Sequence, residues 1–214
     1  MDEEIAIIDA NTRSEKIKNF FIKNKKNLIL IIAIIILVII GYFANDEFKK
    51  KKKIKLANQY HSTIINYNTG EKIKTINKLT NLVNKKDKTY SPLALYFLID
   101  NNLIENREEV NNLFNILIDK TKLEPEIKNL IIYKKALYNS DFLSENELNE
   151  ILRPIINSKS IWKSHALYLI AEYYYSNNEK LKAKEFFNEI ISLINSNKNI
   201  KSESIKRLNR DFSE

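Results

Sequence analysis

Apolar residues follow two different patterns along this chain of 214 residues. Between residues 28 and 44 they form one uncharged run, LILIIAIIILVIIGYFA. After residue 44 they recur at helical spacing, in segments of similar length that clusters of Asn, Ser, Asp or Gly separate. The first pattern predicts a membrane-spanning helix, and the second predicts a series of helical hairpins.

The run at 28–44 contains seventeen residues. As a helix it reaches about 26 Å, the low end of what crosses a hydrocarbon core, and flanking lysines can snorkel to close the gap. A cleaved signal peptide fits less well, because the run exceeds the usual apolar region and no small-x-small cleavage site follows Ala44. A buried core helix is the other alternative. We interpret the run as an uncleaved, single-pass anchor between a short tail at 1–27 and one domain at 45–214. The membrane-flanking lysines are Lys23, Lys25, Lys26, Lys49, Lys50, Lys51, Lys52 and Lys53.

The helical segments after the run have predictable bounds and, at several starts, recognisable capping chemistry. Ser91–Pro92 predicts an N-cap followed by proline at the first helical position, and Glu124–Pro125 repeats the arrangement. Ser144 with Glu147 predicts a capping box. Pro154 is expected to end or kink its helix near Arg153. The expected helices are 46–67, 71–84, 91–102, 106–119, 125–139, 144–157, 160–176, 179–195 and 200–210, the last being either a capping helix or a loose tail.

The clearest repeat unit runs from residue 164 to residue 197. Asn178 takes its turn position, where glycine is usual, and Gly70 takes the same position in a weaker first unit. Val110 and Phe114 match Ala183 and Phe187 in another unit. This is the tetratricopeptide pattern, so the predicted fold class is all-α: one transmembrane helix followed by a tetratricopeptide-like α-solenoid of helical hairpins. Residues at repeat positions 4, 7, 8, 11, 20 and 24 are Leu167, Ile170, Ala171, Tyr174, Ala183 and Phe187.

Composition excludes several classes of chemistry. The only glycines are Gly41 and Gly70, too few for glycine-rich phosphate loops or Rossmann turns, and there is no cysteine. His61 and His165 have no second ligand at metal spacing, so we expect no metal. No Ser, His and Asp arrangement stands out above background, so we expect no enzymatic activity, and we expect no cofactor. The net charge of +8 comes partly from the membrane-flanking lysines, which favours anionic lipid headgroups as partners. Nucleic acid is not expected, because no base-reading motif accompanies the lysines.

A stripe of polar and aromatic residues on the helix at 160–176 is the candidate partner-binding face. In tetratricopeptide arrays the first helix of each pair lines the concave surface. Tyrosine suits such a surface, because it buries apolar area and tolerates water. Core packing against the following helices is an equally open reading of the two tyrosines. The stripe, at i, i+3, i+7 and i+10, is His165, Tyr168, Glu172 and Tyr175.

Three stretches carry a family resemblance. The sequence KIKNFFIKNKKNLI entering the apolar run and GYF leaving it resemble the YfgM-like family of ancillary SecYEG translocon subunits. Thr89–Ala94 resembles the opening of a middle repeat in that family, and Trp162–Phe187 resembles its last complete repeat. The span departs from the family in being isoleucine-rich rather than glycine-containing.

The resemblance implies a location and a role. Basic residues balance at six on each side of the run, so charge does not orient it. Family members are bacterial inner-membrane proteins with the tail in the cytoplasm and the repeats in the periplasm. They associate with SecYEG and with the periplasmic chaperone PpiD. We therefore expect a protein-binding module that assists newly translocated, unfolded polypeptides; the alternative is a non-chaperone scaffold for envelope assembly or cell division.

Overall fold

Every element described in a computed structural model of the protein is a helix. The structure describes residues 2–67 and 72–212, and no strand occurs within those ranges. The chain divides into two compact units, Met1–Lys55 and Leu56–Glu214. The all-helical fold class predicted from the sequence is therefore confirmed for the described residues. The predicted turn at Gly70 lies outside them.

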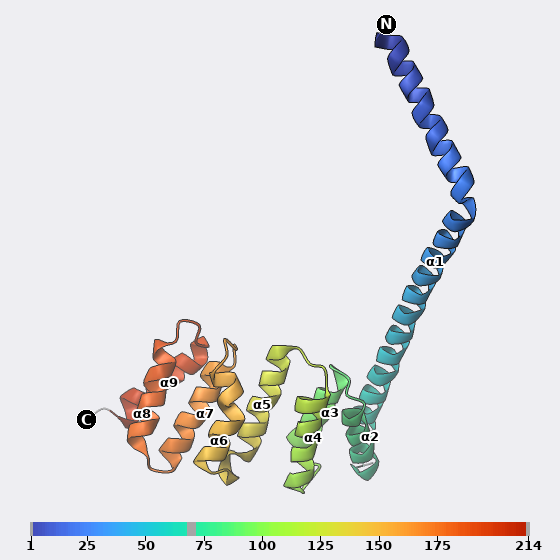
Figure 1. Ribbon diagram of the computed structural model, residues 1–214. Helices are drawn as coiled ribbons and strands as arrows, with labels where there is room; N and C mark the ends of the chain where they lie inside the picture. The colour runs from blue at the N-terminus through green and yellow to red at the C-terminus, as the bar shows by residue number, and fades with distance from the viewer. Residues whose placement is uncertain (1, 68–71, 213–214) are drawn as a thin grey trace. The chain divides into compact units, whose positions relative to one another are not determined.

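The described residues of the first unit lie within one long helix, because α1 runs without a break from Asp2 to Tyr67 (Figure 1). Among the described residues it is the one helix long and apolar enough to cross a membrane, and none of its most apolar window is buried. A core helix would bury that window, so its exposure argues against the core-helix alternative. The predicted helix at 46–67 is not a separate element, since it continues the apolar stretch.

The second unit begins within α1 at Leu56, and its described helices lie close to the predicted ones. Each predicted bound after residue 70 lies within three residues of the observed one. The segment at 200–210, left open from the sequence, is part of a helix. The elements are α2 (Lys72–Asn84), α3 (Tyr90–Asp100), α4 (Arg107–Lys120), α5 (Pro125–Asn139), the 3-10 helix η1 (Ser140–Phe142), α6 (Glu145–Ile156), α7 (Lys163–Ser176), α8 (Lys180–Ser192) and α9 (Lys198–Asp211).

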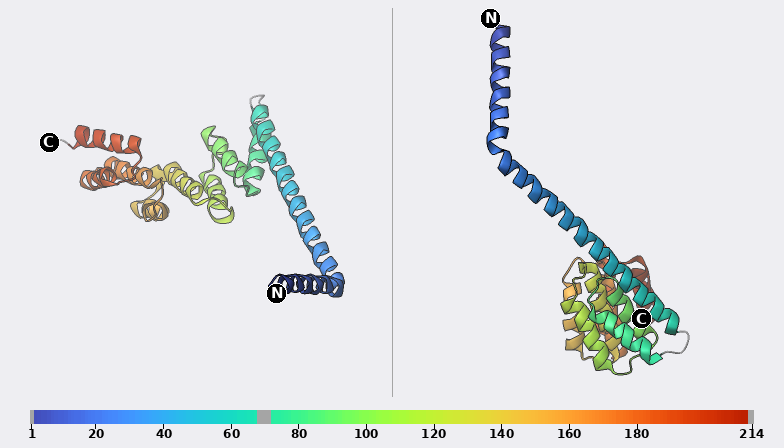
Figure 2. Two further views of the ribbon diagram at one scale, coloured as in Figure 1. Left: turned by 90° about the horizontal axis from the view of Figure 1, so that it is seen from above. Right: turned by 90° about the vertical axis from the view of Figure 1, so that its right-hand side faces the viewer.

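From α2 onward, each α-helix of the second unit packs against the next one in the chain (Figures 1 and 2). In addition, α2 touches α4 and α7 touches α9. The helices α3, α5, α7 and α9 begin at Tyr90, Pro125, Lys163 and Lys198, which are 35, 38 and 35 residues apart. The unit is thus a row of helix pairs of similar length, each buried against its neighbours.

The core of this row consists of two clusters that meet at α5. Ile131 belongs to the cluster formed with α1–α4, whereas Ile132 and Ala136 belong to the cluster formed with α6–α8. Phe114 and Phe187, which the repeat pattern aligns, are both fully buried. Burying an aromatic side chain of this size stabilises the fold by about 2–3 kcal/mol.

Two of the three predicted helix starts are confirmed. Ser144 accepts a hydrogen bond from the Glu147 N–H at 3.4 Å, and the Glu147 carboxylate accepts one from the Ser144 N–H at 2.8 Å, which completes the capping box. Glu124 is the N-cap of α5, with Pro125 at its first position. Pro154 lies inside α6, which continues past it to Ile156, so the helix ends three residues beyond Arg153.

The prediction for Ser91 is wrong. Helix α3 already begins at Tyr90, and Asp87 Oδ1 accepts the N–H groups of Thr89 and Tyr90 at 2.9 and 2.8 Å. The fully buried Ser91 hydroxyl is used elsewhere: it donates to the Leu82 carbonyl at 2.7 Å and accepts from the Asp87 N–H at 2.8 Å. It therefore links the Asp87 N–H, just beyond the end of α2, to the Leu82 carbonyl, which also accepts from the Lys85 N–H at 3.2 Å.

Comparison with two other helix ends explains the position of that hydroxyl. After α3 and α7 a residue with positive φ, Asn102 at 49° and Asn178 at 65°, lets the next N–H reach back to a carbonyl of the last turn. Those bonds, Leu103 N–H to the Leu98 carbonyl and Glu179 N–H to the Tyr174 carbonyl, measure 2.9 and 2.8 Å. After α2, Lys86 has a φ of 54°. The equivalent groups there are the Asp87 N–H and the Leu82 carbonyl, and the Ser91 hydroxyl lies between them. The left-handed turn predicted at Asn178 is confirmed.

Candidate functional site

Helix α7 positions the predicted stripe, and its opposite side is held in the core. Leu167, Ile170, Ala171 and Tyr174 are buried. Ala171 and Ala183 of α8 are both fully buried, and such small side chains let two helices approach closely. Tyr174 donates from its hydroxyl to Glu145 Oε1 of α6 at 2.6 Å. These contacts fix the rotation of α7 and so fix where the stripe points.

Two of the four stripe residues, Glu172 and Tyr175, meet α9 or the residue that follows it, and Tyr168 packs against α8. The Tyr168 ring lies 5.6 Å from the Phe187 ring between centroids, and the Tyr175 ring lies 5.8 Å from the Phe212 ring. The Glu172 carboxylate accepts from Arg207 Nε of α9 at 2.7 Å and also from its Nη2. The structure thus brings Glu172 and Tyr175 together against α9 and Phe212, with Tyr168 beside Phe187 of α8.

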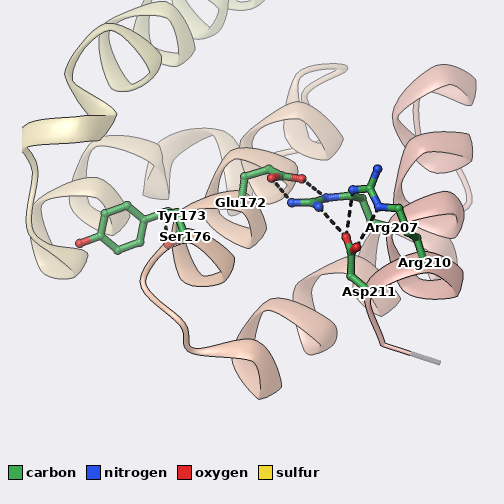
Figure 3. A network of polar contacts seen from close by, with 6 residues as sticks. All are labelled: Glu172, Tyr173, Ser176, Arg207, Arg210 and Asp211. Atoms are coloured by element: carbon green, nitrogen blue, oxygen red, sulfur yellow. Dashed lines mark hydrogen bonds and ion pairs between the residues drawn. The ribbon is translucent and has the colours of Figure 1, made fainter. Parts of the chain in front are cut away.

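Arg207 is the centre of this contact, as Figure 3 shows. Its guanidinium lies 4.2 Å from the Tyr175 ring centroid and also pairs with Asp211, which in turn accepts from Arg210 Nε at 2.8 Å. Only 14% of the Arg207 side chain is exposed. Hydrogen bonding to Glu172 raises the pKa of Arg207, so the guanidinium stays charged. Burial first, and then the neighbouring Glu172 carboxylate, raise the pKa of the Tyr168 hydroxyl to about 12.

His165 lies apart from the other three stripe residues, in an aromatic cluster. Its ring centroid is 5.0 Å from that of Trp162 and 5.8 Å from that of Tyr133, and the latter two rings are stacked. Burial lowers the pKa of His165 and raises that of Tyr133. The Nδ1 atom of His165 is buried and has no hydrogen-bond partner among the described residues. This ring therefore serves as a neutral packing element between α5 and α7.

A groove lies on the other side of Glu172 from α9. Its volume is about 430 Å³, and η1 and α7 form its walls. Figure 3 shows Glu172 between Arg207 on one side and Tyr173 with Ser176 on the other. Asp141 adds a second carboxylate, and no Lys or Arg is among the residues that line the groove. The groove lining is Ser140, Asp141, Leu143, Leu169, Glu172, Tyr173, Ser176 and Asn177.

Sequence reasoning missed Arg207 and Phe212, which complete the arrangement around the stripe. One signal was available, since Glu172 and Arg207 are 35 residues apart, the spacing between the starts of α7 and α9. Opposite charges one repeat apart on facing helices can pair. Whether the stripe binds partners stays a prediction.

The membrane-flanking lysines are all exposed on α1. Two of them pair along the helix: Lys50 Nζ lies 2.8 Å from an Asp46 carboxylate oxygen, and Lys51 Nζ lies 3.7 Å from one of Glu47. These exposed pairs contribute little stability, but they offset part of the positive charge of the lysine cluster.

Within the described residues no three His, Cys, Asp or Glu side chains gather as a metal would require. Comparison of the chain with family models, curated proteins and solved structures finds no match. The resemblance to the YfgM-like family therefore rests on the quoted residues alone, and what it implies stays a prediction.

Proposed function

We propose that this chain is a single-pass membrane protein whose helix-pair domain, a tetratricopeptide-like α-solenoid, binds other polypeptides. The observation that carries the proposal is the row of helix pairs with starts 35, 38 and 35 residues apart, behind one exposed apolar helix. The pair α7–α8 supports it further, because Ala171, Ala183 and Phe187 are fully buried at the repeat positions that need small or aromatic residues. Such arrays present extended surfaces to polypeptide partners.

The proposed location is the bacterial inner membrane, with 1–27 in the cytoplasm and 45–214 in the periplasm. The proposed partners are the SecYEG translocon, a PpiD-like chaperone and newly translocated polypeptides. The sequence KIKNFFIKNKKNLI before the span and the segments at 89–94 and 162–187 support this choice through their resemblance to YfgM-like proteins. Exposed lysines on both sides of the span suit anionic lipid headgroups.

The proposed mechanism is positional. An anchor keeps the binding surface near the exit of the channel, so its effective concentration toward an emerging chain is high without tight binding. Unfolded clients lose entropy when they bind, which keeps each affinity modest and allows release. No chemical step is required of the protein.

The test is protection of unfolded clients from aggregation. The full chain in lipid nanodiscs is mixed with unrelated, chemically unfolded proteins at dilution, and light scattering is followed against empty nanodiscs. We expect slower aggregation that scales with the concentration of the chain. Unchanged scattering at molar excess over several clients would refute client binding.

One observation favours a scaffold as the second candidate. Because α9 and Phe212 cover Glu172 and Tyr175, less of the α7 stripe is open to varied clients than the sequence suggests. A scaffold would retain one defined envelope partner from detergent extracts and leave aggregation of unrelated proteins unchanged. Client protection without a stoichiometric partner would favour the chaperone-associated role.

A further inference from the structure

The contact between Arg207 and α7 has the composition of a binding site for a guanidinium group. Glu172 offers two oxygens to two nitrogens of the guanidinium, and the guanidinium carbon lies 4.2 Å from the centroid of the Tyr175 ring. A carboxylate fork combined with an aromatic face is how proteins recognise arginine rather than lysine. The Phe187 and Tyr175 rings also receive Phe212, five residues after the arginine.

Helix α9, which carries the arginine that lies in this site, is held by few apolar contacts. Among the described residues of α9 only Ser204 is fully buried, and Ile200, Leu208 and Phe212 pack against the core while staying partly exposed. A terminal helix with so little buried apolar surface opens at a lower free energy than the rest of a domain. Its position therefore depends strongly on Arg207 and Phe212.

Glu172 is accessible from a second direction. One third of its side chain is exposed, and it forms part of the wall of the 430 Å³ groove that also contains Asp141. An incoming cationic side chain can reach the carboxylate through the groove while Arg207 still occupies the other side (Figure 3). Competition for one carboxylate would then loosen α9.

We propose that α9 is a displaceable internal ligand of the α7 face, and that the segments which replace it are amphipathic and carry an arginine followed five residues later by an aromatic residue. This inference rests on the proposed function and adds to it the chemistry of the bound polypeptide. In the closed state α9 covers the face; in the open state the Glu172 carboxylate and the Tyr175 ring receive the arginine of another chain.

The test uses a labelled peptide of residues 198–212 of this chain and the full chain in non-ionic detergent. Two variants release α9 in different ways. Arg207→Ala removes the guanidinium that lies in the site, and Glu172→Gln removes the carboxylate that accepts from it. In both, hydrogen exchange of the α9 amides should accelerate. Of the two variants, only Arg207→Ala should gain peptide binding. It should bind the peptide about tenfold more tightly than the unaltered chain does, because the closed state no longer competes. A peptide carrying the same Arg207→Ala change should bind neither variant.

A purely structural role for the ion pair predicts a different result. Both variants would then gain peptide binding equally, or neither would gain any, and either result would overturn the proposal. Phe212→Ala provides a second way to loosen α9 that leaves α7 untouched, and it should raise peptide binding as Arg207→Ala does. If the peptide fails to bind while the full chain still slows aggregation of clients, the inference falls and the proposed function stands. Peptide binding without protection would support the site and refute the client role.

Discussion

Replacing Ser91 by alanine removes a hydroxyl that two backbone groups share. In the native structure the Leu82 carbonyl accepts from it at 2.7 Å and the Asp87 N–H donates to it at 2.8 Å, in surroundings where the serine is fully buried. Alanine fills nearly the same volume, so the change tests hydrogen bonding rather than packing. The backbone at Lys86, with a φ of 54°, holds the two groups on either side of the hydroxyl.

The expected loss follows from what is left unpaired. The Leu82 carbonyl keeps the Lys85 N–H as a partner at 3.2 Å, so the group that loses its partner is the Asp87 N–H. A backbone group left without a partner away from water costs about 1–3 kcal/mol. Alanine returns at most about 0.5 kcal/mol through its better helix propensity. Without the hydroxyl, the turn can close partly and bring the Asp87 N–H toward the Leu82 carbonyl, as the equivalent groups meet after α3 and α7. This closure reduces the penalty further. We expect the free energy of unfolding to fall by about 1–2 kcal/mol.

Ser204 is the matched control, because it is equally buried in α9. Its hydroxyl donates only to the Ile200 carbonyl at 2.9 Å, four residues earlier in the same helix, a group that belongs to the helical ladder already. Ser204→Ala leaves no group unpaired, so its free energy of unfolding should stay within about 0.5 kcal/mol of the unaltered chain.

Both variants are measured by urea unfolding of the full chain in non-ionic detergent, with helical circular dichroism as the signal. A shift in midpoint at constant slope reports a change in stability. The reasoning is refuted if Ser91→Ala unfolds within about 0.5 kcal/mol of the unaltered chain, or if Ser204→Ala loses as much as Ser91→Ala.

Three further predictions use the same unfolding assay. Phe187→Ala should lower the free energy of unfolding by about 3–5 kcal/mol, because the side chain is fully buried, whereas Leu181→Ala on the same helix, where leucine is 80% exposed, should have little effect; equal losses would contradict this. Lys86→Gly should raise stability by about 0.5–1 kcal/mol, because glycine adopts its φ of 54° without strain, and a loss would show that the lysine side chain matters instead. Hydrogen bonds to its N-cap serine lower the pKa of Glu147 below 4.5, so its contribution is present above that pH and is lost as pH falls through the lower, folded pKa. Glu147→Gln should therefore flatten the dependence of stability on acid pH relative to Glu150→Gln, and parallel pH profiles would contradict the assignment.

The sequence predicts the helices well because each one carries its own signals. Apolar spacing places α2–α9, and local capping residues such as Ser144 with Glu147 fix a helix start without help from the rest of the fold. Asn178 adopts the left-handed conformation that its place between α7 and α8 requires.

Ser91 and Lys86 show where local reasoning fails. A serine before a proline looks like an N-cap, but Asp87 already satisfies the first N–H groups of α3, and the Ser91 hydroxyl pairs with α2. Lysine gives no indication of a left-handed turn, because its own preference is helical. Both positions are decided by a neighbouring helix that no local window contains.

The surroundings of the candidate stripe depend on contacts between distant parts of the chain. Spacing correctly places Tyr168, Glu172 and Tyr175 on one side of α7, because helical geometry alone decides which residues share a face. The sequence does not indicate that α9 folds back onto that side, since Arg207 and Phe212 lie in a segment with few apolar residues. His165 turns instead toward Trp162 and Tyr133, which depends on the packing of α5.

The most direct test of the proposed function is to measure on which side of the membrane the helix-pair domain lies. The chain has no cysteine, so a single one can be placed at Ile194→Cys, where the native side chain is 99% exposed, or at Asn19→Cys, exposed on the other side of the span. Intact bacterial cells expressing each variant are treated with a membrane-impermeant maleimide, with permeabilised cells as the reactivity control. If the domain lies in the periplasm as proposed, we expect labelling of Ile194→Cys in intact cells and of Asn19→Cys only after permeabilisation. The reverse pattern would put the domain in the cytoplasm and contradict a role in receiving translocated polypeptides.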